Sequence, residues 1–566
     1  MNFVLRGELS HDDESTTTTI TSHFALGVHS HLLASQKMMH FRGRGLAAAK
    51  AAMRQPLRRM ASLSLSNINQ QVLTAEYAVR GPIVLRSAQI KAQLASDPSS
   101  LPFDNVLACN IGNPQAVGQQ PISFNRQVHA LMTCPDLLAS PEAAKIFPAD
   151  AIARAKEYLT SVPEGVGAYS ESQGFAIVRQ QVADFIAERD GVPANPKDIF
   201  LTDGASKGVE FILKLMLRGS SDGVLVPIPQ YPLYSAALAL ADSHMLGYEL
   251  DEADAWALPM EQVEKAVAGA KAKGVQPRAL VVINPGNPTG NSLLRPNMEE
   301  IVRFCAKEKL VLIADEVWTA TRETQPTGDC RHGHHAPLTA SFPPQVYQEN
   351  IWDEGRPFIS FKEVVSTMKD APPVELVSLH SVSKGFLGEC GIRGGYFELA
   401  GFDPDVQAQL LKLVSIGLCS NTMGQIAVGL MVRPPKPGEP SEPLYAQERG
   451  AILSSMKRRA AAVAASLNAL EGVSCNAPQG AMYAFPSITL PPKAVAAAQA
   501  EGMAPDAYYA MHLLENTGIV VVPGSGFGQK AGTWHFRTTF LPPEDQIDLV
   551  GERMAKFHGE FLAKHA

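Results

Sequence analysis

The chain has 566 residues, a formal net charge of -7, 45% hydrophobic side chains and 19% charged ones. This composition is typical of a globular protein and excludes a fully disordered chain, a collagen-like repeat and a disulfide scaffold. Seven cysteines, none in a Cys-x-x-Cys pair, indicate a reducing compartment. No apolar run approaches the ~20 residues that span a bilayer, and the acidic balance argues against nucleic-acid binding. We therefore expect neither a membrane nor a nucleic acid as a partner.

The first 75 residues differ in charge from the rest of the chain. No Asp or Glu occurs from Ser15 to Ala75, whereas seven Lys and Arg side chains do. A basic, Ser-rich and acid-poor N-terminus is typical of a transit peptide, and its arginines favour the mitochondrial matrix over the chloroplast. A basic tail without a targeting role, on a cytoplasmic protein, is the alternative. Residues 1–75 carry eight basic and four acidic side chains, so the remaining body has a net charge of -11.

Further along, short apolar runs alternate with helical patterns. Strands that are apolar on both faces and separated by helices predict a mostly parallel sheet wrapped by helices. A Pro-rich loop at Pro434–Pro440, followed by a helical stretch at 445–470, indicates a second, smaller domain. The predicted strands are 198–203, 223–228, 278–284, 310–315 and 375–380, and the predicted helices are 206–217, 235–241 and 298–309.

Ligands of such sheets bind at the carboxyl ends of the strands, and a lysine follows one of them. Lys384 lies among small residues, close in sequence to Ser381, Ser383 and Arg393. A desolvated lysine near another cation loses its proton and can form a Schiff base. Hydroxyls and an arginine suit a phosphate dianion. Taken alone, Lys384 would be a solvated surface lysine, but its glycine-rich surroundings and the nearby arginine favour a functional role.

Three turns and one aromatic residue accompany the lysine. Asn284–Gly290 is either a plain Pro/Gly turn or a turn that aims the Asn287 amide at an aromatic hydroxyl. Asp315 ends a buried strand, where a carboxylate needs a partner such as a pyridinium nitrogen. Asp203–Ser206 joins a strand to a helix, whose free N–H groups and dipole favour an anion. Tyr231 is suited to stacking on a flat ring.

These motifs, in this order, resemble those of fold-type I aminotransferases, which use pyridoxal 5'-phosphate. Within class I/II the chain is most similar to the alanine aminotransferases, from about Tyr77 to the C-terminus. The distinctive segments are Asn110–Pro121, Gln230–Tyr234, His380–Gly385, Gly388–Gly391 and His535–Pro543.

The resemblance implies a fold and a domain division. The fold is α/β, with a mostly parallel central sheet wrapped by helices and a smaller α+β domain built from the N-terminal segment and the C-terminal part. The expected parts are a disordered leader at 1–75, an N-terminal arm and small-domain segment at 76–150, a large cofactor-binding domain at 151–430 and a small domain at 431–566.

The resemblance also implies how the cofactor is held. Lys384 is expected to form the Schiff base with it and to move the proton during transfer. Asp315 is expected to pair with the ring nitrogen, Asn287 with the ring oxygen, and Tyr231 to stack on the ring. The other residues implied in cofactor binding are Gly204, Ala205, Ser206, Ser381, Ser383 and Arg393.

The remaining implied roles concern the substrates and a second subunit. Arg537 is expected to clamp the substrate carboxylate, with Gly112 closing over it. Tyr169 resembles a tyrosine that reaches the phosphate across a subunit interface, which implies a homodimer. The implied reaction converts L-alanine and 2-oxoglutarate to pyruvate and L-glutamate in two half-reactions. Glyoxylate as the acceptor, a lyase of the aminocyclopropane-carboxylate synthase type and an inactive paralogue are the alternatives.

One segment departs from the family's pattern. The family has a tyrosine that bonds the ring oxygen three residues after the aspartate, whereas this chain has Trp318 there. Removing the 29 residues Val317–Gln345 would restore the spacing and put Tyr347 in that place. A Val codon begins with GT and a Gln codon can end with AG, so we predict a retained intron, which sequencing the transcript would test. A genuine surface insertion is the alternative.

The same segment contains four potential metal ligands, Cys330, His332, His334 and His335. No second cluster of ligands accompanies them, so we predict no metal site.

Overall fold

The computed structural model describes residues 63–77, 81–316, 351–353 and 355–566. The chain divides into two compact units, Met1–Gln70 and Gln71–Ala566. In the first, Asn67 donates its backbone N–H to the Ser64 carbonyl in a turn. The sequence analysis did not predict the short helix α2 (Gln70–Thr74), which lies within the proposed leader. Tyr347 and the segment Val317–Gln345 lie outside the described residues.

The second unit is organised around a seven-stranded sheet of order β2-β8-β7-β6-β5-β3-β4. Strands β3 to β7 pair in parallel, whereas β8 runs antiparallel to both of its neighbours. The predicted mostly parallel sheet is therefore confirmed, but β4 and β8 were not predicted. The bounds are β2 Ile199–Thr202, β3 Asp222–Ile228, β4 His244–Glu249, β5 Gln276–Ile283, β6 Val311–Asp315, β7 Leu376–Ser381 and β8 Gly395–Ala400.

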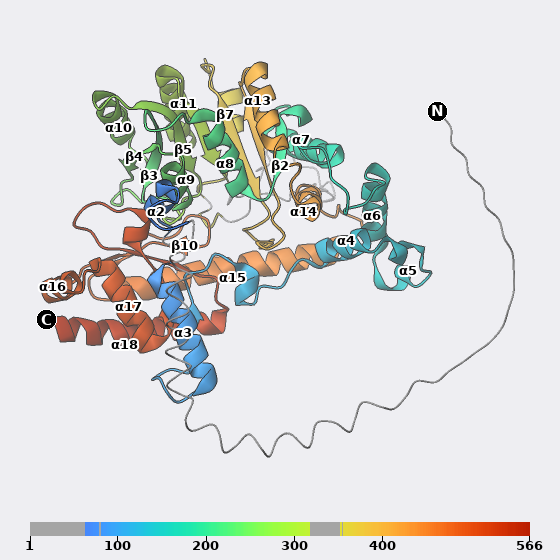
Figure 1. Cartoon of the computed structure of the whole chain (residues 1–566). Coiled ribbons are helices and arrows are strands. Elements are labelled where there is room, and N and C mark those ends of the chain that lie inside the picture. The colour runs from blue at the N-terminus through green and yellow to red at the C-terminus, as the bar shows by residue number, and fades with distance from the viewer. Residues whose placement is uncertain (1–62, 78–80, 317–350, 354) are drawn as a thin grey trace, which may run out of the picture. The chain divides into compact units, whose positions relative to one another are not determined.

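Helices cover both faces of this sheet (Figure 1). Because successive side chains of a strand point to opposite faces, each central strand contributes to two cores. Val281 and Ile313 pack with α8, α9 and α13, whereas Leu280 and Leu312 pack with α10, α11 and α12. The bounds are α8 Ala205–Met216, α9 Leu233–Leu240, α10 Met260–Ala272, α11 Arg295–Glu308, α12 Phe361–Thr367 and α13 Pro404–Ser415.

A third core lies beside β2. Ile199 and Leu201 of that strand pack with apolar residues of α4, α6, α7 and α14. The helix α14 is buried almost along its whole length, because it runs between these helices and the sheet. The bounds are α4 Ser123–Thr133, α5 Ala143–Ile146, α6 Ala149–Ser161, α7 Ala176–Asp190 and α14 Thr422–Val432.

A fourth core joins the two ends of the second unit. The helix α3 packs with α17, and α15 packs with α18, as the blue, orange and red ribbons of Figure 1 show. Strand β1 pairs with β12, Leu107 opposite Ile519, so the smaller part is built from N-terminal and C-terminal segments, as the predicted fold class requires. The bounds of the helices are α3 Pro82–Ser96, α15 Glu442–Asn468, α16 Pro492–Ala500, α17 Pro505–Thr517 and α18 Glu544–His565.

Short strands complete the smaller part and carry residues to the large sheet. Strand β14 pairs with β10 on one side and with β13 on the other. In the second pairing, Val522 lies opposite Arg537. The bounds are β1 Leu107–Ala108, β9 Val473–Ser474, β10 Tyr483–Ala484, β11 Ser487–Ile488, β12 Ile519–Val520, β13 Val522–Pro523 and β14 Phe536–Thr539.

Two kinds of feature do not occur in the described part of the chain. None of its helices is long and apolar enough to cross a membrane. No group of three or more His, Cys, Asp or Glu side chains is arranged to hold a metal ion in that part. The four potential ligands Cys330, His332, His334 and His335 lie outside it.

A buried arginine ties α15 to the segment that follows β14. The Arg459 guanidinium is 8% exposed, and its Nη1 donates to the carbonyls of Leu541 and Pro542, at 2.5 and 2.9 Å. Its neighbour Arg458 instead makes an exposed ion pair with Glu544. The two arginines therefore allow a buried polar contact and a solvated one to be compared at adjacent positions.

We predict that Arg459→Met lowers the free energy of unfolding by about 2 kcal/mol, because two buried carbonyls lose their donor. Urea denaturation followed by circular dichroism measures this. The matched control Arg458→Met should leave the midpoint close to that of the wild type, since exposed ion pairs contribute little. Equal shifts in the two variants would contradict the structural role of Arg459.

Candidate active site

The candidate residues gather at one edge of the central sheet. Strands β5, β6 and β7 are parallel, and β2 runs in the same direction because the antiparallel β8 separates it from β7. Their carboxyl ends therefore meet at this edge, where ligands of such sheets bind. Asp315 is the last residue of β6 and Ser381 the last of β7, while the Asn287 turn follows β5.

An arginine organises one end of the site. Arg393 Nη2 donates to the Asp203 carbonyl at 2.7 Å and to Ser206 Oγ at 3.3 Å, and Nη1 lies 3.4 Å from Ser383 Oγ. Gly204, which precedes α8, has a φ of +83°. A Cβ there would lie 2.6 Å from Arg393 Nη2, so glycine lets the guanidinium approach the helix N-terminus.

The same end collects hydroxyls and free backbone donors. Ser381 Oγ donates to Ser383 Oγ at 2.9 Å, and both side chains are buried. The first turn of α8 begins at Ala205 and offers N–H groups that have no partner within the helix. A cation, two hydroxyls and a helix N-terminus form a cradle suited to a phosphate dianion. The structure therefore places the predicted residues Ser206, Ser381, Ser383 and Arg393 close to one another, beside Gly204 and Ala205 at the start of α8.

A buried carboxylate occupies the middle of the edge. Asp315 is 7% exposed, and the Tyr234 hydroxyl donates to its Oδ2 at 2.9 Å. Burial, followed by the charge of Asp315, raises the pKa of Tyr234 well above its usual value, so this phenol remains a donor at neutral pH. The sequence analysis missed this partner. No local signal pointed to it, because Tyr234 lies 81 positions before Asp315 in the sequence.

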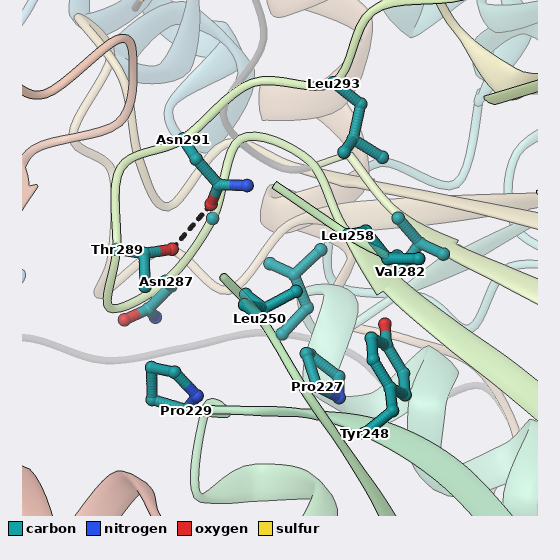
Figure 2. Close-up of a pocket in the computed structure, with 12 residues that line it drawn as sticks. Pro227, Pro229, Tyr248, Leu250, Leu258, Val282, Asn287, Thr289, Asn291 and Leu293 are labelled. Carbon is teal, nitrogen blue, oxygen red and sulfur yellow. Dashed lines mark hydrogen bonds between the residues drawn. The ribbon is translucent and has the colours of Figure 1, made fainter. Parts of the chain in front are cut away.

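The turn that carries Asn287 is held rigidly. Thr289 Oγ1 donates to Asn291 Oδ1 at 2.6 Å, and Asn291 Nδ2 donates to the Trp256 carbonyl at 2.8 Å. Figure 2 shows the first of these bonds close to Asn287, beside a cavity lined by residues such as Pro227. The cavity measures about 20 Å³, which is room for roughly one water molecule. The tight packing fixes the direction of the Asn287 amide, which is 6% exposed.

A second arginine forms the other end of the site. The Arg537 guanidinium lies between two rings, 4.4 Å from the centre of Tyr483 and 4.8 Å from that of Phe527. Its Nη1 donates to Asn287 Oδ1 at 3.1 Å, and its Nη2 to the Asn110 carbonyl at 2.9 Å. Arg537 is 2% exposed, and burial lowers its pKa.

The remaining donors of Arg537 point to a ligand. Its Nε is buried and has no hydrogen-bond partner among the described residues. A guanidinium has five N–H groups, so the two bonds to Asn287 and Asn110 leave three. A carboxylate accepts two parallel bonds from such a fork. The buried charge and its unused donors therefore fit the carboxylate-binding role that the resemblance implies.

The candidate lysine lies beside a glycine of the N-terminal segment. Lys384 Nζ donates to the carbonyl of Gly112. A Cβ on Gly112 would lie 2.8 Å from that Nζ, so a larger residue would displace either the lysine or the backbone. The Tyr483 hydroxyl packs against the same glycine, although the sequence analysis did not single out this tyrosine.

Two predicted residues are not brought into the site of the described chain. Tyr347 lies outside the described residues. The Tyr169 side chain is 77% exposed, and its hydroxyl forms no hydrogen bond with the described residues. Its loop is nevertheless anchored beside the phosphate cradle, because Gln425 Nε2 donates to Ser170 Oγ and Asn421 donates its N–H to Asp203 Oδ1. The proposed reach of Tyr169 across a subunit interface stays a prediction.

Comparison with known proteins identifies the family. The family of class I and II aminotransferases matches residues 141–553. The chain belongs to this family. It is 53% identical over 510 residues to the probable mitochondrial alanine aminotransferase of Dictyostelium discoideum, covering 89% of this chain and 90% of that protein. It is 45% identical over 506 residues to glutamate–glyoxylate aminotransferase 1 of Arabidopsis thaliana, covering 89% and 97%.

A solved structure supports the fold. The alanine aminotransferase of Pyrococcus furiosus superposes with a TM-score of 0.64 at 22% identity. The superposition covers 87% of this chain and all of that one. At this identity the likeness concerns the fold alone, and it agrees with the predicted fold-type I architecture.

We predict that Tyr234→Phe lowers the kcat of transamination about tenfold, because the Asp315 carboxylate loses a charge-assisted hydrogen bond. The acid limb of the pH profile should also move to higher pH, since a donor to the carboxylate favours its charged form. The matched control is Tyr248→Phe, whose buried hydroxyl donates to the Val281 carbonyl at 2.8 Å. The pH profile of Tyr248→Phe should match that of the wild type. An unshifted profile for Tyr234→Phe would contradict the proposed role of Tyr234 as the donor to Asp315.

Proposed function

We propose that this aminotransferase exchanges the amino group between L-alanine and 2-oxoglutarate, giving pyruvate and L-glutamate. The observation that carries the proposal is that one short backbone segment accepts hydrogen bonds from both Arg537 and Lys384. The Asn110 carbonyl accepts from Arg537, and the Gly112 carbonyl accepts from Lys384. The carboxylate-binding cation and the reactive amine are thus held by residues two positions apart. A substrate bound through its carboxylate would then present its Cα to the lysine.

The residues of the site fit pyridoxal 5'-phosphate. The cradle around Arg393 matches the phosphate, and the Asp315 carboxylate matches a protonated ring nitrogen. The partly buried Tyr231 ring offers an apolar face for the cofactor ring. Lys384 would hold the cofactor covalently through its amine. When bound, the cofactor supplies an electron-withdrawing ring that takes up the electron pair released at Cα.

Each side chain then has a separate task. Arg393 and the hydroxyls of Ser381 and Ser383 fix the phosphate and hence the position of the ring. Tyr234 holds the Asp315 carboxylate in place through its hydrogen bond. Arg537 would bind the substrate carboxylate and so orient the bonds at Cα. Lys384 Nζ takes the proton from Cα and returns it during transfer.

We infer the assembly and the location of the protein from two features, one on the described chain and one in the sequence. Tyr169 projects from a loop that is anchored next to the phosphate cradle, so a second copy of the chain would complete each site in a homodimer. The basic leader suits import into the mitochondrial matrix. The Dictyostelium relative is named as a probable mitochondrial enzyme. Both remain proposals for this chain.

A second candidate is transfer to glyoxylate. The 45% identity to a glutamate–glyoxylate aminotransferase over 89% of this chain supports it. Both acceptors are 2-oxo acids, so a single Arg537 would bind the shared carboxylate in either case. The two functions therefore differ in the acceptor side chain and not in the chemistry of Lys384.

The assay that separates them measures pyruvate formed from L-alanine. We expect the purified chain to be yellow from bound cofactor and to form more than one equivalent of pyruvate per active site only when a 2-oxo acid is added. The initial rate should be higher with 2-oxoglutarate than with glyoxylate. Pyruvate formation beyond one equivalent per active site without any acceptor, or a strict requirement for glyoxylate, would contradict the proposal.

The same assay tests the interrupting segment. The full chain should be compared with a variant that lacks Val317–Gln345, which moves Tyr347 to the third position after Asp315. If the segment is a retained intron, the shorter chain is expected to be at least as active as the full one. A shorter chain that is folded but inactive would favour a genuine insertion.

A further inference from the structure

A buried histidine precedes Arg537 by two positions, at the entry to β14. His535 is 2% exposed, and both of its ring nitrogens face oxygen atoms. Its Nε2 lies 3.1 Å from Glu252 Oε2, and its Nδ1 lies 3.0 Å from Gln529 Oε1. The Gln529 amide is oriented by a carboxylate, because its Nε2 donates to Asp506 Oδ2 at 3.2 Å. Gln529 therefore presents its oxygen to the imidazole.

These neighbours fit the protonated form of the ring. An imidazole has two N–H donors only when it is protonated, and the neutral ring would turn one lone pair toward an oxygen. The charged groups that face His535 come from three elements. Glu252 reaches it from the turn after β4, Asp506 of α17 acts through Gln529, and the cation of Arg537 lies on β14. Two carboxylates thus accompany one cation, and the two acceptors suit an imidazolium.

Packed rings connect His535 with the Arg537 guanidinium. The His535 ring stacks on Phe485, with centroids 4.9 Å apart and an interplanar angle of 1°. Phe485 packs edge-on against Phe527 at 5.8 Å, and Phe527 covers the guanidinium at 4.8 Å. Trp256 completes this ring cluster, 5.7 Å from both His535 and Phe485. Because packed interiors transmit displacement, a shift of the imidazole would move the guanidinium through two ring contacts.

The contact with Glu252 joins the two parts of the second unit. Glu252 belongs to the turn after β4 of the large sheet, whereas His535 leads into β14 of the smaller part. The same turn is fastened a second time, because Asn476 Nδ2 donates to the Glu252 carbonyl at 2.8 Å. The ion pair therefore helps to fix β14, and with it Arg537, relative to the large sheet.

We propose that His535 is a positioning residue, whose imidazolium fixes the ring cluster that aims the Arg537 fork at the substrate carboxylate. The inference rests on the carboxylate-binding role proposed for Arg537. When the imidazole loses its proton, one of its two contacts becomes repulsive and the fork loses its alignment. The contribution of His535 is therefore present at low pH and is lost as the pH rises.

The test compares variants of the full-length holoenzyme, with propionate as an unreactive carboxylate probe and its Kd measured by titration calorimetry. At about pH 6.5, His535→Gln should raise the Kd about tenfold, because a misaligned fork loses one bond to a charged group. The ratio of this Kd to that of the wild type should fall toward one as the pH rises to about 9, since the wild type loses the same proton.

A second variant tests the partner carboxylate. Glu252→Gln keeps an acceptor opposite His535 Nε2 but removes the charge that favours the imidazolium. Propionate binding to this variant should therefore weaken at a lower pH than in the wild type. A residue with a structural role alone would not shift the pH dependence of binding.

The matched control is His558→Gln. His558 is also 2% exposed, with Nδ1 3.0 Å from the Tyr509 hydroxyl and Nε2 2.7 Å from the Glu471 carbonyl. Tyr509 stacks on Phe536, whose side chain points to the face of β14 opposite that of Arg537. This variant should lower the melting temperature and leave the Kd of propionate unchanged.

Three outcomes would overturn the positioning role. These are an unchanged Kd in His535→Gln, equal changes of Kd in His535→Gln and His558→Gln, and a Kd ratio that is independent of pH. Failure of the proposed function looks different. A wild-type enzyme without alanine turnover, whose His535→Gln variant still binds propionate more weakly at low pH, would refute that function and support the positioning role.

Discussion

The buried charge of Arg537 is the constraint on which the site depends. A guanidinium that is 2% exposed needs partners for its charge and its donors. Two aromatic rings cover its faces, while Asn287 and the Asn110 carbonyl accept from its edge. These partners come from the large sheet, the N-terminal segment and the smaller part. Placing one cation therefore requires all three to pack together, and the same packing leaves Nε open to a ligand.

The two arginines lie at opposite ends of the site. Arg393 lies just before β8 of the large sheet and faces the N-terminus of α8, whereas Arg537 lies on β14 of the smaller part. Lys384 follows β7 and bonds to Gly112, which shares a short segment with a partner of Arg537. A phosphate at one end and a carboxylate at the other would hold a cofactor and a substrate on the two sides of the lysine. The two charges thus face the ends of the ligands, and the buried side chains of Asn287 and Asp315 lie at the same edge of the sheet, after β5 and at the end of β6.

The central strands could be predicted well from the sequence, because the signal for each of them lies within the strand itself. Strands β3, β5, β6 and β7 are buried on both faces and form continuous apolar runs. The edge strand β4 exposes most of its side chains and has no such run, so it was missed. The phosphate residues were also predictable, since glycine, serine and arginine follow strand ends in recognisable patterns.

The partners of these residues could not be predicted in the same way. The bonds from Tyr234 to Asp315 and from Tyr77 to Tyr231 join positions 81 and 154 residues apart. No residue near Asp315 in the sequence indicates a phenol donor, and no residue near Tyr77 indicates that it belongs to the candidate active site. Such contacts are set by the packing of whole elements, so they emerge only when α9 and the N-terminal segment have been placed in space.

The most direct test of the account concerns the bond between Lys384 and its cofactor. The purified holoenzyme would be reduced with borohydride, digested and mapped by mass spectrometry for lysines that carry a pyridoxyl group. The account predicts that this group is found on the peptide containing Lys384 and on no other lysine. A pyridoxyl group on a different lysine, or none on Lys384 in an enzyme that remains active, would contradict it.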